Sequence, residues 1–189
     1  MVLERLQISY DLKPVDLFHP TEEFLKVNPL GLVPALQDRL SGEVFVDSDL
    51  ILEAIHELSP GGISRIWPED PVIRRQVRRT SGWISGILTA VVARYLESLR
   101  PQDEEHVGWM KEHEANILRT LETLRMTSFR VEPSSIDAFS QADWDLVVML
   151  EYLDLRWPEL QWRKTDPNWE KWLDMAQKAG FFVESKPPA

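Results

Sequence analysis

Hydrophobic residues follow two different periods along the chain. Among residues 8–46 they alternate with polar residues in several short runs, which is typical of strands. From residue 72 to residue 179 they recur every third or fourth residue over long stretches, which is typical of helices. The segment 59–71, rich in proline and glycine, separates the two patterns. We therefore expect an N-terminal α/β domain over residues 1–65 and an all-helical domain over residues 71–189.

The N-terminal pattern predicts short elements joined by turns. The alternating run at 8–17 is expected to be an edge strand, because it contains Pro14, which cannot donate to a sheet ladder. Thr21 is a plausible cap for a short helix that ends near Val27. The other expected elements are the end of a helix at 1–7, a strand from Val33, a turn at Ser41–Gly42 and a returning strand at Glu43–Val46.

Candidate binding chemistry lies where this hairpin meets the next helix. Asp47-Ser48-Asp49 can cap a helix with apolar positions at Leu50, Ile51, Ala54, Ile55 and Leu58. If the bond before Pro34 is cis, the backbone groups of Val33 are left to face a ligand. The unpaired N–H groups of a helix start suit a carboxylate. These features predict recognition of a small peptide-like molecule at Val33 and Ser48, and an ordinary capped helix is the alternative.

The run N-P-L-G-L-V-P-A-L at residues 28–36, with the acidic-Ser pair after it, resembles the glutathione-binding half of glutathione transferases. The resemblance implies that glutathione is a co-substrate. Its cysteinyl backbone would pair with Val33 beside a cis Pro34, and Asp47 and Ser48 would hold its γ-glutamyl end. Leu32 stands where many members have Lys or Gln, and Asp47 stands where Glu is usual, which suggests a weakened or altered glutathione site.

The helical half supports the same resemblance. Long helices are expected from Val72 to about Arg100 and at residues 104–125, and a last helix at 168–179. Ser140-Gln141-Ala142-Asp143 is a capping box before an almost wholly apolar helix, and it is similar to the S-x-A-D box of the family. In the family the first two helices line the second-substrate pocket and the dimer interface. A homodimer is therefore implied, with Trp83 and Tyr95 as candidate pocket residues, although core packing is the better single explanation for most apolar side chains of these helices.

The resemblance also implies a fold class: an incomplete thioredoxin-like α/β domain followed by a helical domain. In the family, a strand and most of a helix precede the part that matches Val2, and the catalytic Ser, Tyr or Cys follows that strand. Ser9 and Tyr10 occupy the expected edge strand instead, so we expect structural roles for them and assign no catalytic residue. Three interpretations follow: an enzyme that adds the glutathione thiol to a small electrophile, a non-catalytic binding or assembly module of the same fold, or an N-terminally truncated gene model of an enzyme.

Composition narrows the partners. The net charge of −10 would repel a nucleic acid, and the cluster Arg74, Arg75, Arg78 and Arg79 is expected to be a solvated helix face. The chain has no Cys, and the spacing of its four His residues indicates no metal site. No apolar run is long enough to predict a membrane span, so a soluble, cytoplasmic protein is expected. Small bacterial and fungal members of the family often serve detoxification or secondary metabolism.

Overall fold

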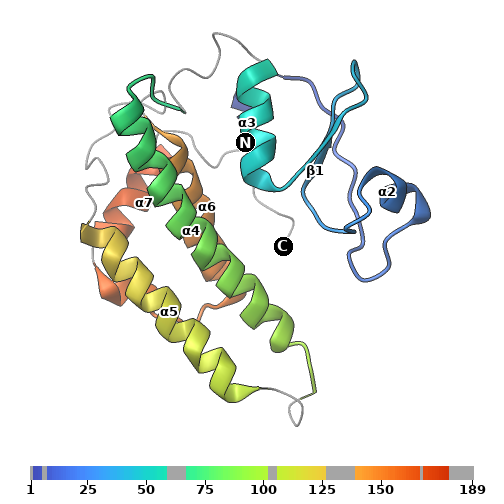
Figure 1. Cartoon of the computed structure of the whole chain (residues 1–189). Helices are drawn as coiled ribbons and strands as arrows, with labels where there is room; N and C mark the ends of the chain where they lie inside the picture. The colour runs from blue at the N-terminus through green and yellow to red at the C-terminus, as the bar shows by residue number, and fades with distance from the viewer. Residues whose placement is uncertain are drawn as a thin grey trace. The chain divides into compact units, whose positions relative to one another are not determined.

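Two units of different construction make up the chain, Met1–Ser64 and Arg65–Ala189. The structure, a computed structural model, describes residues 2–5, 8–58, 67–101, 106–126, 139–166 and 168–178 (Figure 1). Of the proline- and glycine-rich segment 59–71 expected to form the domain boundary, residues 59–66 lie outside the described residues. The polar stretch at 127–138 and the C-terminal tail from Ala179 also lie outside them.

The described part of the N-terminal unit forms three helices and a two-stranded sheet. They are α1 (Val2–Arg5), α2 (Glu22–Val27), β1 (Ala35–Gln37), β2 (Val44–Val46) and α3 (Ser48–Leu58). The strands run antiparallel, with Ala35 opposite Val46 and Gln37 opposite Val44. As expected, Thr21 caps α2 by accepting a hydrogen bond from the Phe24 N–H at 3.2 Å.

The prediction of an edge strand at residues 8–17 was wrong. The described residues form one sheet of two strands, β1 and β2, and the segment 8–17 pairs with neither. Alternation becomes a strand only where a neighbour accepts and donates the backbone hydrogen bonds. The strand expected from Val33 also begins later, at Ala35, because Pro34 has no N–H to donate to the ladder.

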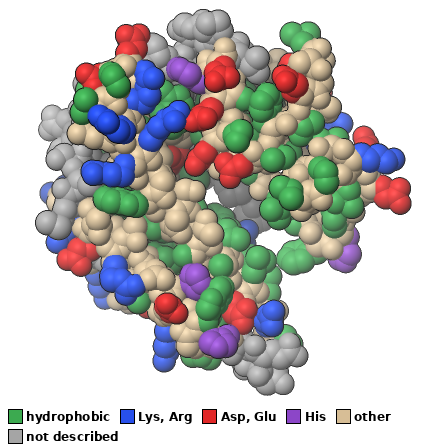
Figure 2. Space-filling model, viewed as in Figure 1, with side chains coloured by type: hydrophobic (Ala, Val, Ile, Leu, Met, Phe, Trp, Pro, Cys, Tyr) green, Lys and Arg blue, Asp and Glu red, His purple; other side chains and the backbone are tan. Residues whose placement is uncertain are grey.

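The second unit is helical: α4 (Pro71–Glu97), α5 (Val107–Met126), α6 (Gln141–Arg156), the 3₁₀ turn η2 (Trp162–Thr165) and α7 (Asn168–Lys178). The predicted capping box is present, since the Ser140 N–H donates to Asp143 Oδ2 at 2.7 Å. Helix α4 packs against both α5 and α6, and α5 packs against η2. The four clustered arginines are exposed, as expected, and Figure 2 shows basic side chains gathered over the first turns of α4. In the part of the chain that the structure describes, no helix is long and apolar enough to cross a membrane.

The core of the helical unit centres on α6, as its nearly continuous apolar sequence predicts. Nine residues of α6 are buried, among them Leu146, Leu150 and Leu153 at 0% exposure. The stripe on α4 is narrower than predicted, because Val92 and Leu96 are exposed. Other large apolar side chains of this core include Ile84, Ile87, Val91, Ile117, Leu121, Leu124, Phe139, Trp144, Trp157, Trp162, Trp169 and Trp172.

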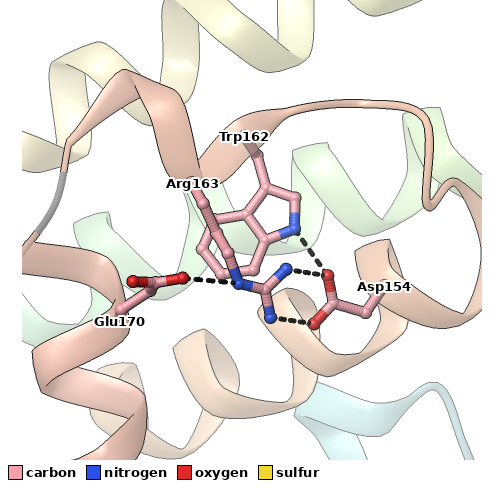
Figure 3. Close-up of polar contacts among 4 residues, drawn as sticks. All are labelled: Asp154, Trp162, Arg163 and Glu170. Atoms are coloured by element: carbon pink, nitrogen blue, oxygen red, sulfur yellow. Dashed lines mark hydrogen bonds and ion pairs between the residues drawn. The ribbon is translucent and has the colours of Figure 1, made fainter.

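A polar network closes the end of this core. The indole N–H of Trp162 donates to Asp154 Oδ1 at 2.9 Å, and Arg163 donates to both carboxylate oxygens of Asp154 at 2.5 Å (Figure 3). Arg163 Nε also lies 3.4 Å from Glu170 Oε1. The Arg163 guanidinium stacks 4.2 Å from the Trp162 ring centroid. The network therefore joins α6, η2 and α7 around a tryptophan that is 1% exposed.

Candidate glutathione site

The antiparallel register of β1 and β2 brings the four predicted site residues to one end of the sheet. Ala35 lies opposite Val46, so the next residues outward, Pro34 and Asp47, flank the same end of the ladder. Val33 and Ser48 are the residues beyond them. The Val33–Pro34 peptide bond is cis, as predicted. The order strand, turn and strand in the sequence thus explains how residues about 15 apart in the chain meet.

Asp47 forms the corner between β2 and α3. Its φ of 75° is left-handed, a conformation in which Asp is among the better tolerated residues. Its carboxylate Oδ1 accepts the N–H of Asp49 at 2.9 Å and that of Leu50 at 3.4 Å. Its carbonyl accepts the Ile51 N–H at 3.0 Å. Asp47 is therefore the N-cap of α3, and its side chain already uses two of the N–H groups at the helix start.

Ser48 is the residue of this helix start that remains available. It is exposed, and within the described residues neither its N–H nor its hydroxyl forms a hydrogen bond. The main-chain groups of exposed Val33 likewise form none within that part of the chain. A ligand that carries a peptide unit and a carboxylate would find a matching set of donors and acceptors here.

Negative charge gathers beside Ser48. Asp49 is an exposed residue, but partial burial of its carboxyl raises its pKa above the usual value of 3.8, and the charges of Asp47 and Glu53 raise that pKa further. A ligand with only a carboxylate would be repelled by these three acids. A group that carries an ammonium next to its carboxylate would place its positive charge among them. The electrostatics therefore favour an amino-acid-like end group over a simple anion.

The loop before Val33 is organised by a residue that the sequence analysis did not single out. Asn28 is 1% exposed, its Nδ2 donates to the Leu32 carbonyl at 2.7 Å, and its Oδ1 accepts the Leu30 N–H at 3.1 Å. The signal was available, because Asn before Pro commonly bonds the backbone two residues onward. Asp70 was missed in the same way: it caps α4 by accepting the Val72 N–H at 2.7 Å, with Pro71 at the first helical position.

The structure places the other predicted candidates as follows. Ser9 and Tyr10 lie exposed in the segment without a strand. Trp83 and Tyr95 are half-buried on α4, with Arg79 5.2 Å from the Trp83 ring centroid and Arg156 4.3 Å from that of Tyr95. These two aromatic residues are about 18 Å apart along the helix axis, as follows from a rise of roughly 1.5 Å per residue. They do not share one small pocket wall, and their role as substrate contacts stays a prediction.

Two family models match the chain. The model "Glutathione S-transferase, N-terminal domain" matches residues 1–58, and "Glutathione S-transferase, C-terminal domain" matches residues 107–174. Among curated proteins, mouse (Mus musculus) glutathione S-transferase omega-1 is 26% identical over 82% of this chain and 62% of its own length. Glutathione S-transferase 1 of Dianthus caryophyllus is 31% identical over 62% of this chain and 54% of its own length. Mouse maleylacetoacetate isomerase is 40% identical over 42% of this chain. The chain spans between 38% and 62% of the length of these three relatives.

Solved structures agree with the family models. A glutathione S-transferase from Methylobacterium radiotolerans, in complex with glutathione sulfonate, superposes with a TM-score of 0.86 at 25% identity, over 100% of this chain and 87% of that one. One from Methylobacillus flagellatus with glutathione bound superposes with a TM-score of 0.82 at 28% identity, over 95% of this chain and 88% of that one. The predicted fold class, a thioredoxin-like N-terminal part followed by a helical part, is therefore confirmed. The chain belongs to the glutathione S-transferase family.

Proposed function

We propose that this protein binds glutathione at Val33, Pro34, Asp47 and Ser48 and adds its thiol to a small electrophile. The observation that carries the proposal is the β1–β2 register, which sets the Val33–Pro34 peptide beside the start of α3. Similar solved structures hold glutathione or glutathione sulfonate, which supports the same ligand here.

The chemistry of glutathione fits the groups at the site. Its cysteinyl peptide unit would pair with the main chain of Val33, as an added strand does at a sheet edge. Its γ-glutamyl carboxylate would accept the N–H and the hydroxyl of Ser48, at the positive end of α3. The neighbouring ammonium would face the acidic cluster of Asp47, Asp49 and Glu53, in which partial burial and the two neighbouring charges raise the pKa of Asp49.

In the proposed reaction the glutathione sulfur, as a thiolate, forms a bond to an electrophilic carbon of the second substrate. The electron pair of the broken bond leaves with the displaced group, and the thiol proton goes to solvent. The step needs a lowered thiol pKa, which a hydrogen-bond donor near the sulfur provides. Either Trp83 or Tyr95 of α4 is the proposed contact of the second substrate. Small bacterial and fungal members of the family often serve detoxification or secondary metabolism, and we propose such a role for this chain as a cytoplasmic homodimer.

The binding step is tested by titrating glutathione into the full chain in a calorimeter. The parent protein should bind, and Ser48→Ala should weaken binding about tenfold, the effect of losing roughly 1.4 kcal/mol of hydrogen bonding. Ser41→Ala is the matched control, because Ser41 is an exposed serine in the turn at the opposite end of the same hairpin. Equal affinity of Ser48→Ala and the parent protein would remove the proposed carboxylate contact.

A non-catalytic binding or assembly module is the second candidate. Ser48 is the one hydroxyl among the four site residues and would face the γ-glutamyl end, so none of the four can activate the thiol. Conjugation of an aryl halide separates the two functions. Turnover above background at saturating glutathione supports the enzyme, whereas glutathione binding without turnover supports the module. Sedimentation of the same sample tests the proposed homodimer, and a mass near 22.0 kDa would contradict it.

A further inference from the structure

Asn28 is the most deeply buried polar residue described in the N-terminal unit. It is 1% exposed, in a unit whose other buried described residues are Ile51, Ala54 and Ile55 of α3. A polar side chain is buried at such a position only when its donors and acceptors find partners. The partners of Asn28 are all backbone groups, which indicates that its role concerns the path of the chain.

Four hydrogen bonds of Asn28 connect α2 to the residues just before the proposed site. Its N–H donates to the Phe24 carbonyl at 2.8 Å, which ends α2, and its carbonyl accepts the Gly31 N–H at 3.0 Å. Its side chain accepts the Leu30 N–H at 3.1 Å and donates to the Leu32 carbonyl at 2.7 Å. The last of these bonds fixes the peptide group that joins Leu32 to Val33, whose main chain would pair with glutathione.

The loop also needs a glycine for this arrangement. Gly31 has a φ of 66°, and a Cβ there would lie 3.4 Å from Leu25 Cδ2. The left-handed residue turns the chain back so that the Leu32 carbonyl reaches the Asn28 amide. Position 28 must supply an acceptor for the Leu30 N–H and a donor to the Leu32 carbonyl. The Asn amide provides both in one short side chain.

We infer that Asn28 is a positioning residue of the glutathione site: its amide holds the 30–33 backbone so that the main chain of Val33 is ready to pair with the ligand. The inference rests on the proposed function. Binding of a peptide is tighter when the protein backbone that pairs with it is already ordered, because ordering then costs nothing on binding. Loss of the Asn28 amide should therefore reduce the free energy of glutathione binding more than it reduces the free energy of unfolding.

Two variants and a control test this inference in the full chain. Asn28→Asp keeps the acceptor for the Leu30 N–H but loses the donor to the Leu32 carbonyl, and Asn28→Ala loses both. Asp38→Ala is the control, because Asp38 organises the other end of the hairpin in a similar way, accepting the N–H groups of Leu40 at 3.1 Å and Ser41 at 2.9 Å. Glutathione affinity is measured by calorimetry, and the order of the fold by amide hydrogen exchange in β1 and β2.

We expect Asn28→Asp to raise the Kd of glutathione about tenfold or more and Asp38→Ala to change it less than about threefold, at comparable protection of β1 and β2. If Asn28→Ala fails to fold, the Kd of Asn28→Asp alone tests the inference. Equal Kd values for Asn28→Asp and the parent protein would overturn the inference and leave the proposed function standing. An equal loss of affinity in Asn28→Asp and Asp38→Ala would also overturn it, since general loosening of the unit would then explain both. Absence of binding by the parent protein would overturn the proposed function and this inference with it.

Discussion

Different interactions stabilise the two units of this protein. The helical unit has a continuous apolar core, in which Leu121, Leu150 and Ala176 are 0% exposed. The described part of the N-terminal unit buries three apolar side chains, all on α3, and leaves large ones such as Phe18 (70% exposed) and Leu40 (98%) at the surface. Figure 2 shows hydrophobic side chains gathered over the described part of this unit.

The described part of the N-terminal unit buries few apolar side chains, and hydrogen bonds between short polar side chains and the backbone order it instead. Thr21 caps α2, Asn28 holds the 30–33 loop, Asp38 closes the hairpin turn and Asp47 caps α3. Each such bond is local, and each typically contributes only about 0.5–1.5 kcal/mol. The proposed glutathione contacts all lie in this unit. Its geometry is therefore sensitive to single polar substitutions, whereas the helical unit should be sensitive to lost volume.

The largest expected effect tests this contrast directly. Trp162→Ala should destabilise the helical unit by about 3–5 kcal/mol, because it removes a buried indole and leaves a cavity. Phe18→Ala removes another aromatic ring, but from the surface of the N-terminal unit, and should change stability by less than about 0.5 kcal/mol.

Urea unfolding followed by tryptophan fluorescence measures the first effect selectively. All eight tryptophans, from Trp67 to Trp172, lie in the helical unit, so this signal follows that unit. Amide hydrogen exchange in α2 and in β1 follows the other unit for Phe18→Ala. A cost for Phe18→Ala as large as that for Trp162→Ala would show that the apolar surface of the N-terminal unit is covered in solution.

A smaller effect is expected from the charge in the polar network. Asp154→Asn keeps an acceptor for the Trp162 indole N–H but removes the charge that holds Arg163 in a two-bond pair. Hydrogen bonds to charged groups are worth roughly 1.5–3 kcal/mol, and exposure reduces that value, so we expect a loss of about 1 kcal/mol. The same carboxylate is the main reason that the pKa of Arg163 is raised above its ordinary value.

Fluorescence-detected unfolding at low and at high salt measures this loss. The difference between Asp154→Asn and the parent protein should shrink at high salt, because the Arg163 side chain is 41% exposed and screening reaches it. Asp145→Asn changes another carboxylate of α6 and controls for the loss of one negative charge. A salt-independent difference would assign the effect to packing around Trp162.

The sequence predicted the helical unit well because helical periodicity is a local property that core packing reinforces. The apolar run after Ser140 and the Ser140–Asp143 box placed α6 correctly, and α7 ended within one residue of its predicted end. The edge strand at 8–17 failed for the opposite reason. A strand depends on a partner elsewhere in the chain, and alternation alone does not supply one.

The site residues also fall into two groups, those that a local motif predicts and those whose role depends on the folded structure. The cis peptide at Val33–Pro34 and the cap at Asp47 were predicted from a short motif and its resemblance to a family. Asn28 was not, although it stands at the start of that motif, because its importance depends on burial and on a bond to the Leu32 carbonyl. Neither property can be read from spacing.

The smallest expected effect concerns the acidic cluster beside Ser48. Burial, together with the charges of Asp47 and Glu53, raises the pKa of Asp49 in the folded protein above 3.8, so the folded state holds the proton more tightly than the unfolded state. The stability of the N-terminal unit should then fall as the pH rises from about 3.8 through the raised pKa, and stay lower at neutral pH. Asp49→Asn cannot ionise and should not show this fall.

Amide exchange in α3, compared between Asp49→Asn and the parent protein at matched pH, should show equal protection near pH 4 and greater protection of the variant near pH 7. A difference in protection of the same size at both pH values would mean that the effect of Asp49 comes from its shape or from helix capping. The negative potential around the proposed ammonium position would then be weaker than proposed.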